Sequence, residues 1–180
     1  MQKLVMDRNF WKGRLSEVTD RKEIHRAVYK GVTLAQWWKI QECNQLILMT
    51  LVTPKEDGSP YRVLDCGCGY GALLDILPAF VDYTGVDISP DLLEVAKELN
   101  PNEKFIQGDL KHLQFGDQVF DLCIARSMEG MILENVGKHS WFLMQREMLR
   151  VSPLLLLLNY SKPNQFKVLD KLDFTDPIFD

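Results

Sequence analysis

The sequence is poor in residues that would build a metal centre or a disulfide framework. It has four cysteines and three histidines in 180 residues. Cys66 and Cys68 lie close together, but no second cysteine pair offers zinc-ligand spacing, and the histidines are scattered along the chain. We therefore expect the cysteines to be small buried residues and expect no metal site.

Long hydrophobic runs and an excess of positive charge are also missing. No stretch reaches the roughly 20 apolar residues of a membrane-spanning helix, and the N-terminus lacks a signal-peptide core. The formal net charge of −4 argues against broad nonspecific attraction to nucleic acid. These absences predict a cytoplasmic protein with no membrane partner. Apolar residues make up 46% of the chain, enough for one substantial core in a single domain.

The most informative segment that is present is an apolar run followed by alternating glycines, Val63-Leu64-Asp65-Cys66-Gly67-Cys68-Gly69-Tyr70-Gly71. Residues 62–64 are typical of a buried strand, and residues 72–77 are typical of the start of a helix packed on that strand. Glycines between strand and helix let the backbone turn sharply and let a ligand approach the main chain. Free N–H groups at the helix N-terminus would favour an anionic or strongly polar ligand group, so the segment predicts a nucleotide-type site.

Strand and helix patterns alternate beyond this loop. Ser89-Pro90-Asp91 predicts a helix start, with Ser89 as the cap, and Asn100-Pro101 predicts its end. We expect the inward stripe of this helix to contain Leu92, Leu93, Ala96 and Leu99. Residues 141–149 indicate another helix, and the five leucines at 154–158 suit a strand covered on both faces. The order predicts a parallel sheet with helices on both sides.

Three acids follow three apparent strands of this sheet, namely Asp65, Asp87 and Asp109. A carboxylate can accept from paired ribose hydroxyls, from an exocyclic amine or from a cationic amino group. Open α/β sheets bind ligands beyond the carboxyl ends of their strands, where these acids would lie. For each acid taken alone, helix capping or turn formation is the alternative explanation.

The glycines alone also fit a dinucleotide fingerprint. Gly67-x-Gly69-x-x-Ala72 matches it, and Asp87 lies at a suitable distance downstream. An NAD-dependent oxidoreductase is therefore one alternative. It gives no reason for Asp65 together with Asp109.

Taken together, in order and suitably spaced, these segments resemble the class I S-adenosylmethionine-dependent methyltransferases over roughly residues 61–159. The resemblance implies an α/β fold with a Rossmann-like, doubly wound, mostly parallel sheet flanked by helices. It also implies S-adenosyl-L-methionine as the cofactor, held through its methionine part by the glycine loop. Asp87 would bind the ribose, Asp109 the adenine, and Ile88 and Leu110 would enclose the adenine ring. The expected cofactor-binding residues are Asp65, Gly67, Cys68, Gly69, Tyr70, Gly71, Asp87, Ile88, Asp109, Leu110 and Arg126.

Both ends of the chain depart from that core. We expect residues 1–60 to form an N-terminal helical extension that acts as a lid, with helices over 21–32 and 34–51, and residues 61–180 to form the cofactor-binding domain. The C-terminus is short for the family, so the leucine strand would become an exposed apolar sheet edge. We expect residues 166–174 to fold back over that edge, in a monomer or a homodimer.

The acceptor is less constrained by the sequence. The chain lacks the Asn/Asp-Pro-Pro-aromatic and Pro-Cys signatures of enzymes that methylate DNA, which favours a small-molecule acceptor over nucleic acid or protein. Glu129 is the acid best placed to bind or deprotonate an acceptor, with an exposed loop acid as the alternative. The catalytic residue is otherwise unassigned. A catalytically silent cofactor-binding subunit is the second functional alternative.

Overall fold

The structure is a computed structural model, described here for residues 13–16, 24–29, 31–159 and 165–172. Its centre is a six-stranded sheet with the strand order β3-β2-β1-β4-β5-β6. Neighbouring strands pair in parallel except β5 and β6, which are antiparallel. The sheet confirms the predicted doubly wound, mostly parallel architecture. The strands are β1 (Tyr61–Cys66), β2 (Val81–Asp87), β3 (Lys104–Gln107), β4 (Leu122–Arg126), β5 (Leu155–Leu158) and β6 (Phe166–Leu169).

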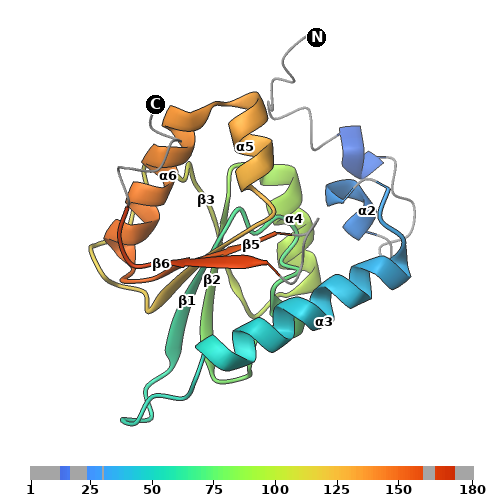
Figure 1. The fold of residues 1–180 in the computed structure, drawn as a ribbon. Helices are drawn as coiled ribbons and strands as arrows, with labels where there is room; N and C mark the ends of the chain where they lie inside the picture. Colours follow the sequence, from blue (N-terminus) through green and yellow to red (C-terminus); the bar gives the residue numbers. More distant parts are fainter. Residues whose placement is uncertain (1–12, 17–23, 30, 160–164, 173–180) are drawn as a thin grey trace.

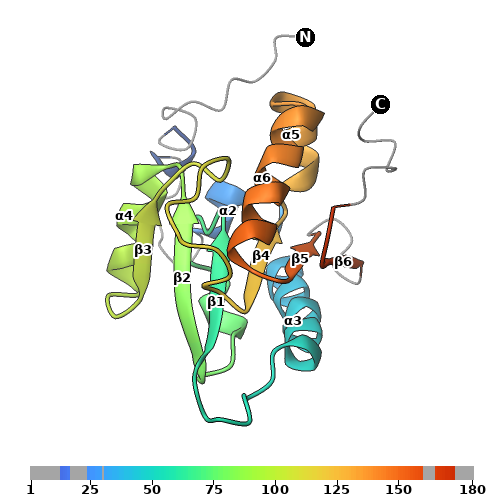
Figure 2. The same ribbon diagram turned by 90° about the vertical axis from the view of Figure 1, so that its left-hand side faces the viewer.

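Helices cover both faces of the sheet, as Figures 1 and 2 show. One face packs against α5 and α6, where the buried Trp141 and Met148 meet Leu155 of β5. The other face packs against α3 and α4, where Leu48 and Ala96 belong to one buried cluster. The helices are α2 (His25–Val28), α3 (Leu34–Leu51), α4 (Pro90–Leu99), α5 (Glu129–Asn135) and α6 (Lys138–Val151).

Helix α3 has the bounds that the sequence predicts, and its start is fixed by a capping box. The Thr33 Oγ1 accepts from the Gln36 amide at 3.3 Å, and the Gln36 Oε1 accepts from the Thr33 amide at 2.9 Å. The helix predicted over residues 21–32 appears, within the described part, as the single turn of α2. Residues 17–23 lie outside the described part of the chain.

The helix predicted directly after the glycine loop is wrong. Residues 72–77, all of them described, form turns and a short 3-10 helix at Leu74–Ile76 instead. Pro78 disfavours helical backbone at Leu77, and the few residues left before it are too short for a stable α-helix. Helix α3 contacts this 3-10 segment and covers the same face of the sheet through Leu48.

Helix α4 begins as predicted, because the Ser89 hydroxyl accepts from the Leu92 amide at 3.3 Å. The inward stripe is confirmed for Leu92, Leu93 and Ala96, whereas Leu99 is 44% exposed. Leu99 occupies the last turn of the helix, beyond the sheet-facing cluster. In the described ranges no helix is both long and apolar enough to cross a membrane.

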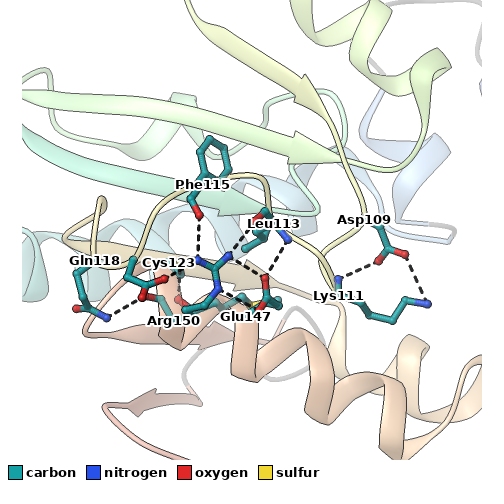
Figure 3. A network of polar contacts seen from close by, with 10 residues as sticks. Asp109, Lys111, Leu113, Phe115, Gln118, Cys123, Glu147 and Arg150 are labelled. Atoms are coloured by element: carbon teal, nitrogen blue, oxygen red, sulfur yellow. Dashed lines mark hydrogen bonds and ion pairs between the residues drawn. The ribbon is translucent and has the colours of Figure 1, made fainter.

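The connection from β3 to β4, residues 108–121, is described throughout and contains neither helix nor strand. Arg150 of α6 holds it in place, as Figure 3 shows. The Arg150 guanidinium donates to the carbonyls of Leu113 and Phe115 at 2.8 and 2.9 Å and forms an ion pair with Glu147 at 2.9 Å. These contacts fix the loop that contains Asp109.

Strand β6 covers the leucine strand. Leu156 pairs with Val168 and Leu158 with Phe166 in the antiparallel register. This pairing confirms that the C-terminal segment folds back over the edge, for the residues of β6. Residues 173 and 174, the end of the predicted covering segment, lie outside the described ranges.

Candidate functional site

A cavity of about 1060 Å³ lies at the carboxyl ends of the parallel strands. Ten of the predicted cofactor-binding residues line this cavity: Asp65, Gly67, Cys68, Gly69, Tyr70, Asp87, Ile88, Asp109, Leu110 and Arg126. Gly71 does not line the cavity. A Cβ atom added to Gly71 would lie 3.0 Å from the ring of Phe105. The structure therefore brings ten of the eleven predicted residues to one place.

The glycine loop relies on backbone that other residues rarely adopt. Gly67, Gly69 and Gly71 have φ angles of 72°, 56° and 85°, in the left-handed region. A Cβ atom on Gly67 would also collide with the thioether of Met128. Glycine at this position is thus favoured by the backbone angle, and any larger residue would also have to displace the Met128 side chain.

Four amides of this loop, those of Gly67, Cys68, Gly69 and Gly71, already donate to acceptors within the protein. Gly67 and Cys68 both donate to the Val86 carbonyl, at 2.8 and 3.0 Å, and Gly69 donates to the Asp87 carboxylate at 2.8 Å. Residues 72–77 contain a 3-10 helix at Leu74–Ile76 and no α-helix, so no α-helix N-terminus lies behind the loop. The predicted anion site at the N-terminus of an α-helix is therefore wrong. Since a dinucleotide diphosphate depends on the N–H groups of such a helix N-terminus, this geometry argues against the NAD alternative.

Asp87 organises the loop while facing the cavity. One of its oxygens accepts from the Gly69 amide and the other from the Ser89 amide at 2.9 Å. Burial raises the pKa of Asp87, and these two backbone hydrogen bonds oppose that rise. Each carboxylate oxygen has a second lone pair, so the group can still accept from paired hydroxyls of a ligand.

Asp65 and Arg126 place opposite charges in the wall of the cavity. Asp65 is 3% exposed and accepts from the Tyr83 hydroxyl at 2.9 Å. Burial raises the pKa of Asp65 to about 6, although the positive charge of Arg126 opposes the rise. Arg126 is 8% exposed. Among the residues that the structure describes, no carboxylate oxygen lies within 4.0 Å of its guanidinium.

Two residues of α3 contact Arg126. The Gln41 Oε1 accepts from Arg126 Nη1 at 2.6 Å, and the Gln41 Nε2 donates to the Ala72 carbonyl at 2.9 Å. The Trp37 ring lies 5.4 Å from the Arg126 guanidinium carbon. The sequence analysis missed Gln41. The available signal was its position four residues after Trp37, which places both side chains on one face of the helix.

The opposite end of the cavity carries Asp109 and two apolar side chains. Asp109 accepts from the Lys111 amide at 2.9 Å and lies 3.5 Å from the Lys111 ammonium. Leu110 is buried, whereas Ile88 is 56% exposed. A flat ring could enter between these apolar side chains with its polar edge toward Asp109.

A third part of the cavity lies between α5 and β6. Glu129 begins α5, and its carboxylate forms an ion pair with Lys167 of β6 at 3.3 Å. Met131 and Phe166 also line this part. The total volume is at the upper end of the about 300–1,000 Å³ usual for one small-ligand site. It therefore leaves room for a second molecule beside a nucleoside-sized ligand.

The cysteines near the site are structural. Cys66, Cys68 and Cys123 are buried free thiols, as predicted, whereas Cys43 on α3 is only partly buried. Burial raises the pKa of the Cys66 and Cys68 thiols well above their ordinary value. The described residues contain no group of three or more histidine, cysteine, aspartate or glutamate side chains suited to a metal ion.

Comparison with known proteins gives one consistent result. Residues 64–151 match the family model described as "Methyltransferase domain". A phosphatidylethanolamine N-methyltransferase from Cereibacter sphaeroides is 33% identical over 79 residues, covering 41% of this chain and 39% of that protein. The ubiquinone/menaquinone biosynthesis C-methyltransferase UbiE from Rhodopseudomonas palustris is 33% identical over 85 residues, 42% of this chain and 34% of that protein.

The fold is shared with solved structures. The PH0226 protein from Pyrococcus horikoshii aligns with a TM-score of 0.57 at 26% identity, covering 68% of this chain and 57% of that one. A phosphoethanolamine N-methyltransferase from Haemonchus contortus shares the fold with a TM-score of 0.62 at 16% identity, covering 84% of this chain and 31% of that one. The chain thus spans less than half the length of the two curated relatives described above.

Proposed function

Because the chain belongs to the class I S-adenosylmethionine-dependent methyltransferase family, we propose that it binds S-adenosyl-L-methionine and transfers its methyl group to a small-molecule acceptor. One observation carries this proposal. The acids at or near the ends of β1, β2 and β3, namely Asp65, Asp87 and Asp109, line a single cavity. It lies beside a glycine loop in which the amides of Gly67, Cys68 and Gly69 donate to β2. Such a site suits a ligand with donor groups and a positive charge better than a diphosphate.

The residues of the site suit the parts of this cofactor. The buried carboxylate of Asp65 would receive the cationic amino group of the methionine part. Asp87 would accept from the ribose hydroxyls, and Asp109 from the adenine amine, with Ile88 and Leu110 against the ring. The glycines let the cofactor lie against the loop backbone, where Cys68 and Tyr70 complete the wall.

When bound, S-adenosylmethionine supplies a methyl carbon that its sulfonium sulfur has already activated. The acceptor atom forms a bond to this carbon while the carbon–sulfur bond breaks, which leaves S-adenosylhomocysteine. The protein contributes mainly by holding the acceptor in line with that bond. Where the acceptor carries a proton of high pKa, Glu129 is the nearest candidate to take it, once its pairing with Lys167 is released.

The acceptor would occupy the part of the cavity between α5 and β6. Small molecules are favoured because the cavity, about 1060 Å³ in total, would also have to hold the cofactor, and the named relatives include a lipid and a quinone methyltransferase. Nucleic acid and protein acceptors are the alternatives. We also propose that residues 1–60 act as a helical lid on the cofactor domain, 61–180. A cytoplasmic location is a further proposal.

Calorimetric titration of the full chain with S-adenosylmethionine, S-adenosylhomocysteine and NAD tests the cofactor. We expect binding of the first two and none of NAD. Asp87→Asn should weaken this binding strongly, whereas Asp82→Asn, in an exposed position on the same strand, should leave it unchanged. Uptake of NAD alone would refute the proposal.

Turnover is tested with acceptor panels grouped by the atom methylated, with S-adenosylhomocysteine as the product measured. Formation of this product with a small molecule supports the proposal. Tight cofactor binding without product, across amines, hydroxy acids, quinols, lipids, RNA and peptides, would favour the silent binding subunit instead.

A further inference from the structure

Asp65 and Arg126 form an unusual arrangement of buried charges. Asp65 is the next-to-last residue of β1 and Arg126 the last of the neighbouring β4. Both residues are more than nine-tenths buried at the wall of the same cavity. Within the described residues they form no ion pair with one another or with any other charged group. Each is hydrogen-bonded to a neutral side chain, Asp65 to Tyr83 and Arg126 to Gln41, and no opposite charge is in direct contact with either. Buried charges without such contact are costly, so a ligand that carries both a positive and a negative charge would be stabilised between them.

Resting on the proposed cofactor, we infer that Arg126 binds the α-carboxylate of its methionine part and that Gln41 is the positioning residue for Arg126. Asp65 and Arg126 would then receive the ammonium and the carboxylate of one amino acid group. Carboxylate and guanidinium match geometrically, because a guanidinium can donate two parallel hydrogen bonds to the two carboxylate oxygens. Arg126 has five N–H donors, and Gln41 accepts from one of its nitrogens.

Gln41 is itself held at its other end. Its Nε2 donates to the carbonyl of Ala72, so its Oε1 must face Arg126. Trp37, one turn earlier on α3, lies beside the same group: the Arg126 guanidinium carbon is over its ring, 5.4 Å from the ring centroid. Because the Gln41 amide is neutral, it orients the guanidinium and leaves its charge uncompensated for the ligand.

The test compares two ligands that differ by one carboxylate, S-adenosylmethionine and decarboxylated S-adenosylmethionine, by calorimetry. The variants are Gln41→Leu, Arg126→Met and the double substitution. Gln45→Leu, the same change at an exposed position of α3, is the matched control. We expect the wild type and the control to prefer the carboxylated ligand by about 10- to 100-fold, the range of a hydrogen-bonded charge pair.

Arg126→Met should abolish this preference, and Gln41→Leu should reduce it several-fold. The double variant should behave like Arg126→Met, because Gln41 acts through Arg126. The preference is the ratio of two affinities measured on the same variant, so a loss common to both ligands cancels, and the urea unfolding midpoint of each variant checks that it is folded.

The outcomes separate the two proposals. Failure of the wild type to bind either ligand would refute the proposed function. Equal binding of both ligands by the wild type would leave that function standing and refute the role of Arg126. Equal weakening of both ligands by Gln41→Leu would show that Gln41 is structural and would overturn its positioning role.

Discussion

The buried charge of Asp65 should lower the free energy of unfolding, although the residue belongs to the proposed binding site. Its side chain is buried in the wall of the cavity, and burial raises its pKa from the ordinary 3.8 to about 6 even with Arg126 nearby. The folded chain therefore holds this proton more tightly than the unfolded chain does. As the pH rises through the interval from about 4 to about 6, the folded state loses stability relative to the unfolded state.

The size of the effect follows from the two pKa values. Each pKa unit corresponds to about 1.4 kcal/mol, so the raised value of Asp65 costs on the order of 3 kcal/mol above pH 6. Asp65→Asn removes the charge and keeps an oxygen that can accept from the Tyr83 hydroxyl. We expect this variant to unfold at higher urea concentration than the wild type at pH 7.5, while its affinity for S-adenosylmethionine collapses.

The assay is urea unfolding at a series of pH values, with Asp82→Asn, on the same sheet but exposed, as the control. The stability difference between Asp65→Asn and the wild type should shrink as the pH falls from 6 to 4 and be gone below pH 4. A variant that is less stable than the wild type at pH 7.5, or a difference that does not vary with pH, would refute the reasoning.

Three further outcomes are expected. Arg150→Met should lower the free energy of unfolding by about 2 kcal/mol, because two carbonyls of the 108–121 loop lose their donor; an unchanged urea midpoint would contradict this. Gly67→Ala should lose at least about 1 kcal/mol and most cofactor affinity in calorimetry, since φ is 72° and Met128 occupies the space; wild-type affinity would disprove it. Leu169→Asp, which faces the α6 side of the core, should lower the melting temperature far more than Val168→Asp on the exposed face of β6, and equal losses would contradict the register.

Much of this architecture was predictable because it depends on local patterns. The leucine strand, the bounds of α3 and the Ser89 cap follow from hydrophobic spacing and capping chemistry within a few residues. The gathering of Asp65, Asp87 and Asp109 in one cavity was predictable for a different reason. Parallel strands end at the same edge of a sheet, so strand order alone brings these residues together.

What escaped prediction depends on contacts between distant segments. The apolar residues 72–77 suggest a helix, but Pro78 leaves too short a segment, and α3 contacts the 3-10 turn that forms there. The glycine loop suggests free amides, but their acceptors lie on β2, at Val86 and Asp87. Gln41 and Arg126 are 85 positions apart, and neither residue alone signals the contact.

The contact between Gln41 and Arg126 has a consequence for exchanging parts between relatives. The segment shared with the methyltransferase family model begins at Leu64, after α3 has ended. A chimera that grafts this segment onto another relative's leading helix would keep the glycines and the three acids. It would also contain Arg126 without Gln41, the residue that orients the Arg126 guanidinium. Among natural homologues, we therefore expect the glutamine and the arginine to be gained and lost as a pair.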